Sequence, residues 1–198
     1  MNPAAETGLP ASSAWEKASQ AAFCHDWRGE NADPRLETKA RFLWSDEYLF
    51  VQFRCRYRSI YVYDGGNVRR DQLWLRDVAE IFIRPGNGDP MHYREFEISP
   101  NGDWLDLDID HGKKSILNCD LKSIVRIDAN ASQWSAELAV PFSCLTTAIR
   151  PDEIWRLNLF RIEGPESGRF YSAWLPTFTS KPNFHVPEHF GELRLMSS

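Results

Sequence analysis

Aromatic rings beside polar side chains are the residues of this sequence best suited to chemistry. The 198 residues include 8 tryptophans, and such rings can cover the apolar face of a sugar through dispersion and C–H/π contact. Trp74 is flanked by Asp71, Gln72, Arg76 and Asp77, which predicts an exposed loop. Carboxylates, amides and arginines bond pairs of sugar hydroxyls. Rings and polar groups together therefore favour a site that binds carbohydrate.

Three polar side chains interrupt runs that otherwise alternate like strands. Glu80 lies on the opposite side of its strand from Ile81, Arg94 shares a side with Phe96, and Asn158 breaks an apolar run. Each could bond sugar hydroxyls. The alternative is a structural role, as a solvent-facing carboxylate for Glu80 and as an arginine with a buried stem for Arg94. Both interpretations stay open at this point.

Catalytic signals are weak. Glu95 and Glu97 point the same way along a strand, about 7 Å apart from the strand rise, and an inverting glycosidase uses carboxylates at a similar spacing. Carboxylates on the same face of a strand are common, however. The sequence has no GxSxG, Walker A or GxGxxG motif, which leaves binding without cleavage as the favoured reading and enzyme activity as an open question.

Metal sites have only loose signals. Asp106, Asp108 and Asp110 form a row of carboxylates on one strand face, and calcium prefers such oxygen ligands. Their spacing is not that of an EF-hand loop, so we expect a solvated face, with structural calcium left open and no other cofactor expected. His185 and His189 are four residues apart in a predicted loop, which rules out a helical zinc motif.

The net charge and the cysteines limit which other functions the sequence allows. The net charge of -5 and pI near 5.6 give no electrostatic footprint for nucleic acid or an anionic membrane, and no stretch is apolar enough to span a bilayer. The four cysteines form no CxxC pair; Cys55 is a predicted core residue, and one or two disulfides stay open. No signal peptide is visible in residues 1–13, so location stays open: extracellular or periplasmic if processed, otherwise cytoplasmic.

The elements that must position these residues are strands, because the dominant hydrophobic period is two. We predict a single domain over residues 1–198, an all-β antiparallel β-sandwich or jelly roll. Helical signals are confined to residues 14–22 and 142–146. The predicted strands are 38–44, 48–57, 78–84, 93–99, 104–110, 124–128, 134–140, 155–162, 171–175 and 192–196. The predicted core contains Leu49, Val51, Phe53, Ile81, Ile83, Leu107, Leu138 and Leu157.

Six stretches in order resemble the family 9 carbohydrate-binding modules. They are ARFLWSDEYLFVQF (40–53), LWLRDVAEIFIR (73–84), YREFEISPNGDWLD (93–106), WSAELAVP (134–141), WRLNLFR (155–161) and FHVPEHFGELRL (184–195). The resemblance spans nearly the whole chain. It implies a β-sandwich that binds a mono-, oligo- or polysaccharide without cleaving it, in association with glycoside hydrolases.

The resemblance also implies where the sugar binds. The family site is a slot in which two rings clamp a sugar: Trp74 matches the first ring, and Phe184 takes the place of the second, a tryptophan in the best-known members. Glu80 matches a carboxylate that bonds sugar hydroxyls, while Asn183 and Trp174 lie near Phe184 and share its role. Arg94 and Asn158, on neighbouring strands, complete the predicted carbohydrate-binding set.

Two other functions compete with sugar binding. The wider superfamily contains haem-binding domains with methionine and histidine ligands, and Met91-His92 with a distant partner such as His185 is the candidate here. A small glycoside-active enzyme is the other alternative.

Overall fold

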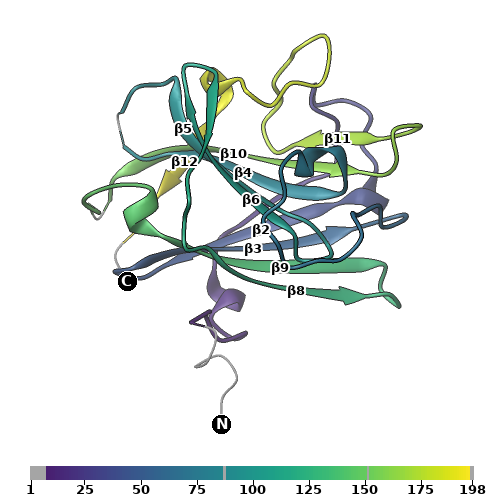
Figure 1. Ribbon diagram of the computed structural model, residues 1–198, viewed down its shortest axis with the longest axis horizontal. Coiled ribbons are helices and arrows are strands. Elements are labelled where there is room, and N and C mark those ends of the chain that lie inside the picture. The colour runs from purple at the N-terminus through teal and green to yellow at the C-terminus, as the bar shows by residue number, and fades with distance from the viewer. Residues whose placement is uncertain (1–7, 87, 151, 197–198) are drawn as a thin grey trace.

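The period-two pattern folds as antiparallel strands in two layers (Figure 1). The computed structural model describes residues 8–86, 88–150 and 152–196. The first sheet has the order β1 (Gln20–Phe23), β2 (Thr38–Trp44), β3 (Tyr48–Arg56), β9 (Gln133–Pro141), β8 (Lys122–Asp128). The second has the order β11 (Phe170–Ala173), β10 (Ile154–Glu163), β4 (Val78–Arg84), β5 (His92–Ile98), β6 (Trp104–Asp110), β7 (Lys113–Ile116), and β12 (Gly191–Arg194) also pairs with β10. The predicted β-sandwich is confirmed.

Helical structure is limited to short 3₁₀ turns in the described residues. They are η1 (Trp15–Lys17), η2 (Pro34–Leu36), η3 (Leu73–Leu75), η4 (Phe142–Cys144) and η5 (Pro187–His189). The predicted helical stretch 14–22 is wrong in its second half, where β1 pairs with β2 along the edge of the first sheet. Strand β7 was not predicted, because three of its four residues are polar and the alternation that marks a strand is missing.

The core lies between the sheets, as the predicted residues require. Leu49, Val51, Phe53, Leu138 and Leu157 are all buried there at 1% exposure or less. Ile81 and Ile83 of β4 face the same interior. Leu107 is buried as predicted, but it belongs to a different cluster, on the other face of the second sheet.

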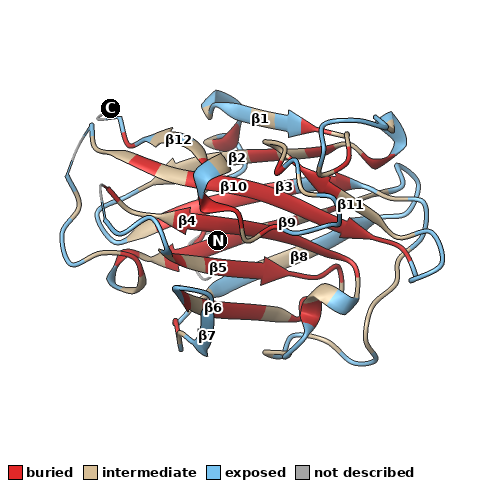
Figure 2. Cartoon of the chain, turned by 90° about the horizontal axis from the view of Figure 1, so that it is seen from above, coloured by how far each residue is buried: buried red, intermediate tan, exposed pale blue. Residues whose placement is uncertain are grey.

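The outer face of the second sheet is therefore buried as well (Figure 2). Its cluster includes Phe82 of β4, Tyr93 of β5 and Phe160 of β10, together with Phe184 and Phe190 from beyond β11. Residues 174–190, which we call the covering segment, supply the last two rings. Each of the strands β4, β5 and β10 consequently buries side chains on both faces, which is why their sequences carry apolar residues at both parities.

Both ends of the covering segment are attached to one edge of β10. Strand β11 pairs with residues 160–163 of β10, and β12 pairs with residues 154–157. In the gap between them, the Asn158 side chain donates to the Leu175 carbonyl at 2.8 Å and accepts from the Leu175 amide at 3.0 Å. The covering segment thus leaves this edge, crosses the outer face and returns to it (Figure 1).

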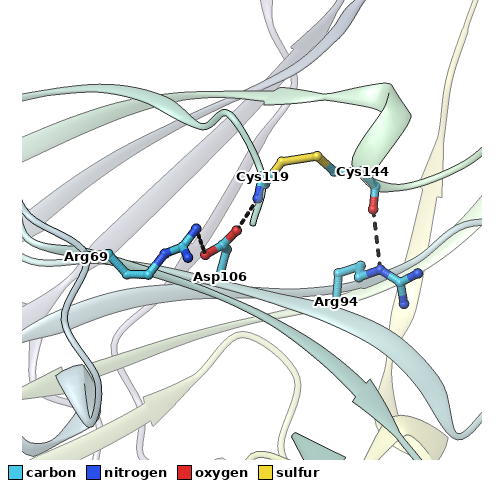
Figure 3. Close-up of a disulfide and its surroundings, with 5 residues drawn as sticks. All are labelled: Arg69, Arg94, Asp106, Cys119 and Cys144. Carbon is cyan, nitrogen blue, oxygen red and sulfur yellow. Dashed lines mark hydrogen bonds and ion pairs between the residues drawn. A yellow bond between two sulfur atoms is a disulfide. The ribbon is translucent and has the colours of Figure 1, made fainter. Parts of the chain in front are cut away.

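A disulfide joins Cys119, before β8, to Cys144 in η4, while Cys24 and Cys55 are free (Figure 3). Cys55 is a fully buried core residue, as predicted, and burial raises the pKa of its thiol to about 11. Beside the disulfide, Asp106 is fully buried and pairs with Arg69 at 2.8 Å. The expectation that the aspartates of β6 form a solvated face is therefore wrong for Asp106.

Candidate ligand-binding site

A cavity of about 260 Å³ lies on the outer face of the second sheet, beneath the covering segment. This volume is slightly below the roughly 300–1,000 Å³ of pockets for drug-sized molecules, so the cavity suits one small ring. Its walls come from η3, from the strands β4, β5, β7, β10 and β11, and from the covering segment. The lining residues are Trp74, Glu80, Phe82, Glu95, Lys114, Ile162, Tyr171, Pro182, Asn183, Phe184 and His185.

The loop that carries Trp74 is held rigidly. Leu73 is fully buried, and its burial turns the next side chain outward in η3, so that Trp74 is only partly exposed and lines the cavity. Arg76 stacks between Tyr61 and Tyr63, at 4.5 and 4.1 Å from the ring centroids. Cation–π contacts of this kind order a loop without filling the site.

The opposite aromatic wall is Phe184. One face of this ring stacks on Phe160, with centroids 4.1 Å apart and planes inclined by 11°, and the side chain is 8% exposed. Trp74 has no aromatic partner of this kind among the described residues; instead, the Lys114 ammonium stands 4.8 Å from its ring centroid. The two rings are therefore unequal: Phe184 is packed into the wall, and Trp74 offers the more open surface.

Two carboxylates, Glu80 and Glu95, line the polar side of the cavity, and the buried Glu97 lies next to them without lining it. Glu80 of β4 lies directly opposite Glu97 of β5, and Glu95 lies two residues from Glu97 on the same side. All three are at most 2% exposed. Burial, and then the charge on Glu95, raises the pKa of Glu80 well above its usual value. Burial likewise raises the pKa values of Glu95 and Glu97, because an ion is poorly solvated there.

His185 is neutral near pH 7. Burial, and then the nearby Lys114 charge, lowers its pKa to about 4. Its Nδ1 lies 2.8 Å from the Tyr93 hydroxyl, and its Nε2 lies 3.9 Å from Glu95. At neutral pH the Nδ1 of this histidine can therefore accept a hydrogen bond from the Tyr93 hydroxyl, and its Nε2 can carry an N–H donor, without adding positive charge.

Four of the seven predicted binding residues meet at this cavity: Trp74, Glu80, Asn183 and Phe184. Asn183 also accepts a bond from the His185 amide at 3.1 Å, which shapes the covering segment. The other three predicted residues are placed elsewhere in the structure.

Arg94 lies on the inner side of β5, next to the disulfide (Figure 3). Its Nε donates to the Cys144 carbonyl at 3.3 Å, and its guanidinium pairs with Asp108. The alternation of β5 puts Arg94 on the opposite face from Glu95, so it cannot line the cavity.

Asn158 and Trp174 support the covering segment rather than lining the cavity. The side-chain nitrogen and oxygen of Asn158 both form hydrogen bonds with the Leu175 backbone. Trp174 packs against the core between the sheets. It also lies so close to Gly191 that a Cβ there would be 2.9 Å from the indole, so only glycine fits at the start of β12.

The cavity is also lined by residues that the sequence does not mark as binding residues: Phe82, Glu95, Lys114, Tyr171 and His185. Glu95 was identifiable, because it shares a strand face with Glu97 and β5 neighbours β4. Lys114 carried no signal, since it comes from the short polar edge strand β7.

No three His, Cys, Asp or Glu side chains are grouped to hold a metal ion in the described part of the chain. Over the same residues, no helix has the length and apolarity to span a bilayer.

The aromatic walls and polar groups of this cavity on a β-sandwich suit the binding of a sugar ring, and the family match identifies the class as carbohydrate-binding domains. Residues 10–198 match the family described as Carbohydrate family 9 binding domain-like. The chain belongs to this family, whose function is to bind carbohydrate, and the family resemblance in the sequence is confirmed.

Several known proteins are similar to this chain. A protein of Arthroderma benhamiae described as an extracellular protein is 23% identical over 177 residues, 81% of this chain and 79% of that protein. A Bacteroides uniformis structure has a TM-score of 0.76 at 14% identity, over 90% of this chain and 87% of the other. A family 9 module of Caldicellulosiruptor kristjanssonii, solved with cellotriose, has a TM-score of 0.68 at 14% identity, over 96% and 88% of the two chains; the glucose complex gives 0.66 at 15%, over 96% and 90%.

Proposed function

We propose that this domain holds one sugar ring in the cavity between Trp74 and Phe184 and does not cleave it. Trp74 covers an apolar face of the ring, and Glu80, Glu95, Asn183 and His185 bond its hydroxyls. The described chain would act as one binding domain, alone or beside a glycoside hydrolase.

The observation that carries this proposal is the convergence of Trp74 and Phe184. The two rings are 110 positions apart in the sequence, in η3 and in the covering segment. They line the same cavity, which Glu80 of β4 also lines. Local sequence does not bring them together. The small volume and the similarity to a module solved with glucose and cellotriose further support a glucose-sized ring or the end of a chain.

Calorimetric titration with glucose and cellotriose, after a glycan array has ranked other sugars, tests the proposal. Trp74→Ala should weaken binding of the best sugar by about tenfold or more, because it removes both ring area and the stacking contribution. Trp44→Ala is the matched control, since Trp44 is also partly exposed but belongs to β2 in the other sheet. Equal affinities of the wild type and the Trp74 variant would contradict this site.

The haem-binding alternative is not favoured by the geometry. His185 lies on the Tyr93 side of β5, where it bonds the Tyr93 hydroxyl. His92 points to the other side of the same strand, where it lies 2.8 Å from Asp108. Two ligands on opposite faces of one strand cannot share an iron.

The glycosidase alternative is also not favoured. An inverting enzyme needs one ionised carboxylate base and one carboxylic acid on opposite sides of the bond to be broken. Glu95 and Glu97 instead lie on the same face of one strand, and of the two only Glu95 lines the cavity. Burial raises the pKa of both.

A further inference from the structure

The carboxylates of the cavity lack partners, whereas other buried carboxylates of this chain have them. Asp103 is fully buried and accepts from Arg70 Nε at 2.6 Å. Glu163, at 1% exposure, accepts from Arg58 at 2.7 Å. Asp77 accepts from the Gly164 amide at 2.7 Å. Where the fold alone requires a buried carboxylate, this chain supplies a donor for it.

Glu80, Glu95 and Glu97 have no such donor. One oxygen of Glu80, one of Glu95 and both of Glu97 are buried without a hydrogen-bond partner among the residues that the structure describes. Like charges directly across two strands destabilise a sheet, and an unsatisfied buried polar group does so too. Glu80 and Glu95, the two that line the cavity, are therefore arranged for a donor that enters it.

The positive charges near the cavity do not meet this need. His185 is neutral, and the Lys114 ammonium lies beyond ion-pair distance of the three glutamates. Lys114 instead stands over the Trp74 ring, on an exposed side chain that can swing away. An ammonium in front of Trp74 thus already has an electrostatically favourable place between the ring and the carboxylates.

We propose that the preferred ligand of the cavity is an amino sugar, a pyranose that carries a primary ammonium group. This inference rests on the proposed function and names the ligand class of the same site. The ring stacks on Trp74, and the ammonium displaces Lys114 and donates to Glu80 and Glu95. A cationic ligand replaces protons on these glutamates, whose pKa values burial has raised, so its binding releases protons.

The test compares three sugars with the same ring: glucosamine, glucose and N-acetylglucosamine. Titration calorimetry is done at about pH 6.5, where a primary amine of this type keeps its proton. We expect glucosamine to bind at least about tenfold more tightly than the two neutral sugars, the value of one charge-assisted hydrogen bond. Proton release, measured in buffers of different ionisation enthalpy, should accompany glucosamine binding only.

Variants assign the effect to the carboxylates. Glu80→Gln should remove most of the preference for glucosamine over glucose, whereas Glu192→Gln, on the exposed strand β12, should not. Lys114→Gln should strengthen glucosamine binding by about two- to fivefold, the range of a surface charge pair. Lys113→Gln, which removes a charge of the same sign from the neighbouring position of β7, should leave it unchanged.

Two results would distinguish a failure of the amino-sugar inference from a failure of the proposed function. If glucose and glucosamine bind equally, the amino-sugar inference is overturned and the proposed sugar site stands. If no sugar of the array or of this series binds to the folded protein, the proposed function itself fails. A titration with CaCl₂ alone completes the design: saturable calcium binding that Glu80→Gln abolishes would overturn the inference, because the carboxylates would then serve a metal.

Discussion

The two faces of strands β4 and β5 differ in what burial achieves. On the inner face, Ile81, Ile83 and Phe96 pack in the core between the sheets, and the buried Asp106 beside Phe96 is paired with Arg69. On the outer face, one residue earlier along the same strands, Glu80 and Glu95 are about equally buried but have no hydrogen-bond partner for one oxygen each among the described residues. Burial of a residue alone therefore does not show that it belongs to the core. An apolar buried face stabilises the fold, and a polar buried face reserves hydrogen-bonding capacity for a ligand at a cost in stability.

The largest effect is expected on the inner face. Ile81→Ala should lower the free energy of unfolding by about 2–5 kcal/mol, the usual cost of deleting a buried aliphatic side chain. Sugar affinity, measured where the variant is folded, should not change, because the side chain points away from the cavity. Denaturant unfolding and calorimetric titration check the two halves. A loss of affinity without a loss of stability would break the distinction between the faces.

Phe184→Ala should affect both properties, since the ring belongs to the outer cluster and to the cavity wall. We expect a destabilisation of about 3 kcal/mol, at the low end of the range for buried phenylalanine, together with weaker sugar binding. Thermal unfolding with and without saturating sugar measures both. An unchanged melting temperature would show that the stack on Phe160 contributes little.

Glu97→Gln should stabilise the protein in a pH-dependent way. Burial raises the folded-state pKa of Glu97 above its unfolded value. The neutral form therefore favours folding below the unfolded pKa, and this contribution is lost as the pH rises through the folded pKa. Glutamine does not titrate, so the variant should match the wild type near pH 4 and exceed it by at least about 1 kcal/mol at alkaline pH. Urea unfolding across pH gives the difference, and a constant offset would contradict the assigned cause.

The smallest effect is expected for Arg94→Gln. Because Arg94 lies on the inner side of β5, away from the cavity, and bonds Asp108 and the Cys144 carbonyl, sugar affinity should stay within about twofold even if stability falls. Titration with the best sugar tests this. A tenfold loss would return Arg94 to the binding site.

The sequence predicted the strands and the inner core well, because the alternation of apolar and polar residues along a strand indicates which side chains face an apolar layer. It misplaced Leu107, since alternation identifies the two faces of a strand but not which of them lies between the sheets. In β4 both parities are apolar, with Val78 and Phe82 beside Ala79 and Ile81, and this near-continuous pattern is typical of a strand covered on both sides.

The binding site was predictable only in part. Trp74, Glu80 and Phe184 were assigned through the family resemblance, and no local pattern brings η3 next to the covering segment. Asn183 and Trp174 were assigned because they lie near Phe184 in the sequence, and only Asn183 lines the cavity. Arg94 and Asn158 were assigned as polar residues on neighbouring predicted strands, a pattern that does not show which face reaches the cavity or that a side chain bonds the backbone. Lys114 was missed because its strand has no apolar periodicity.

The attachment of β11 and β12 to one edge of β10 has an evolutionary consequence. The residues between these strands should be able to change in length or composition while both anchors, the Asn158 bonds, Gly191 and aromatic rings at positions 184 and 190 remain. Loop closure depends only weakly on loop length, so insertions here should be tolerated. Relatives could therefore diverge in the ligands they select by exchanging this one segment, and grafting residues 176–188 between family members is a direct route to a domain with a new preference.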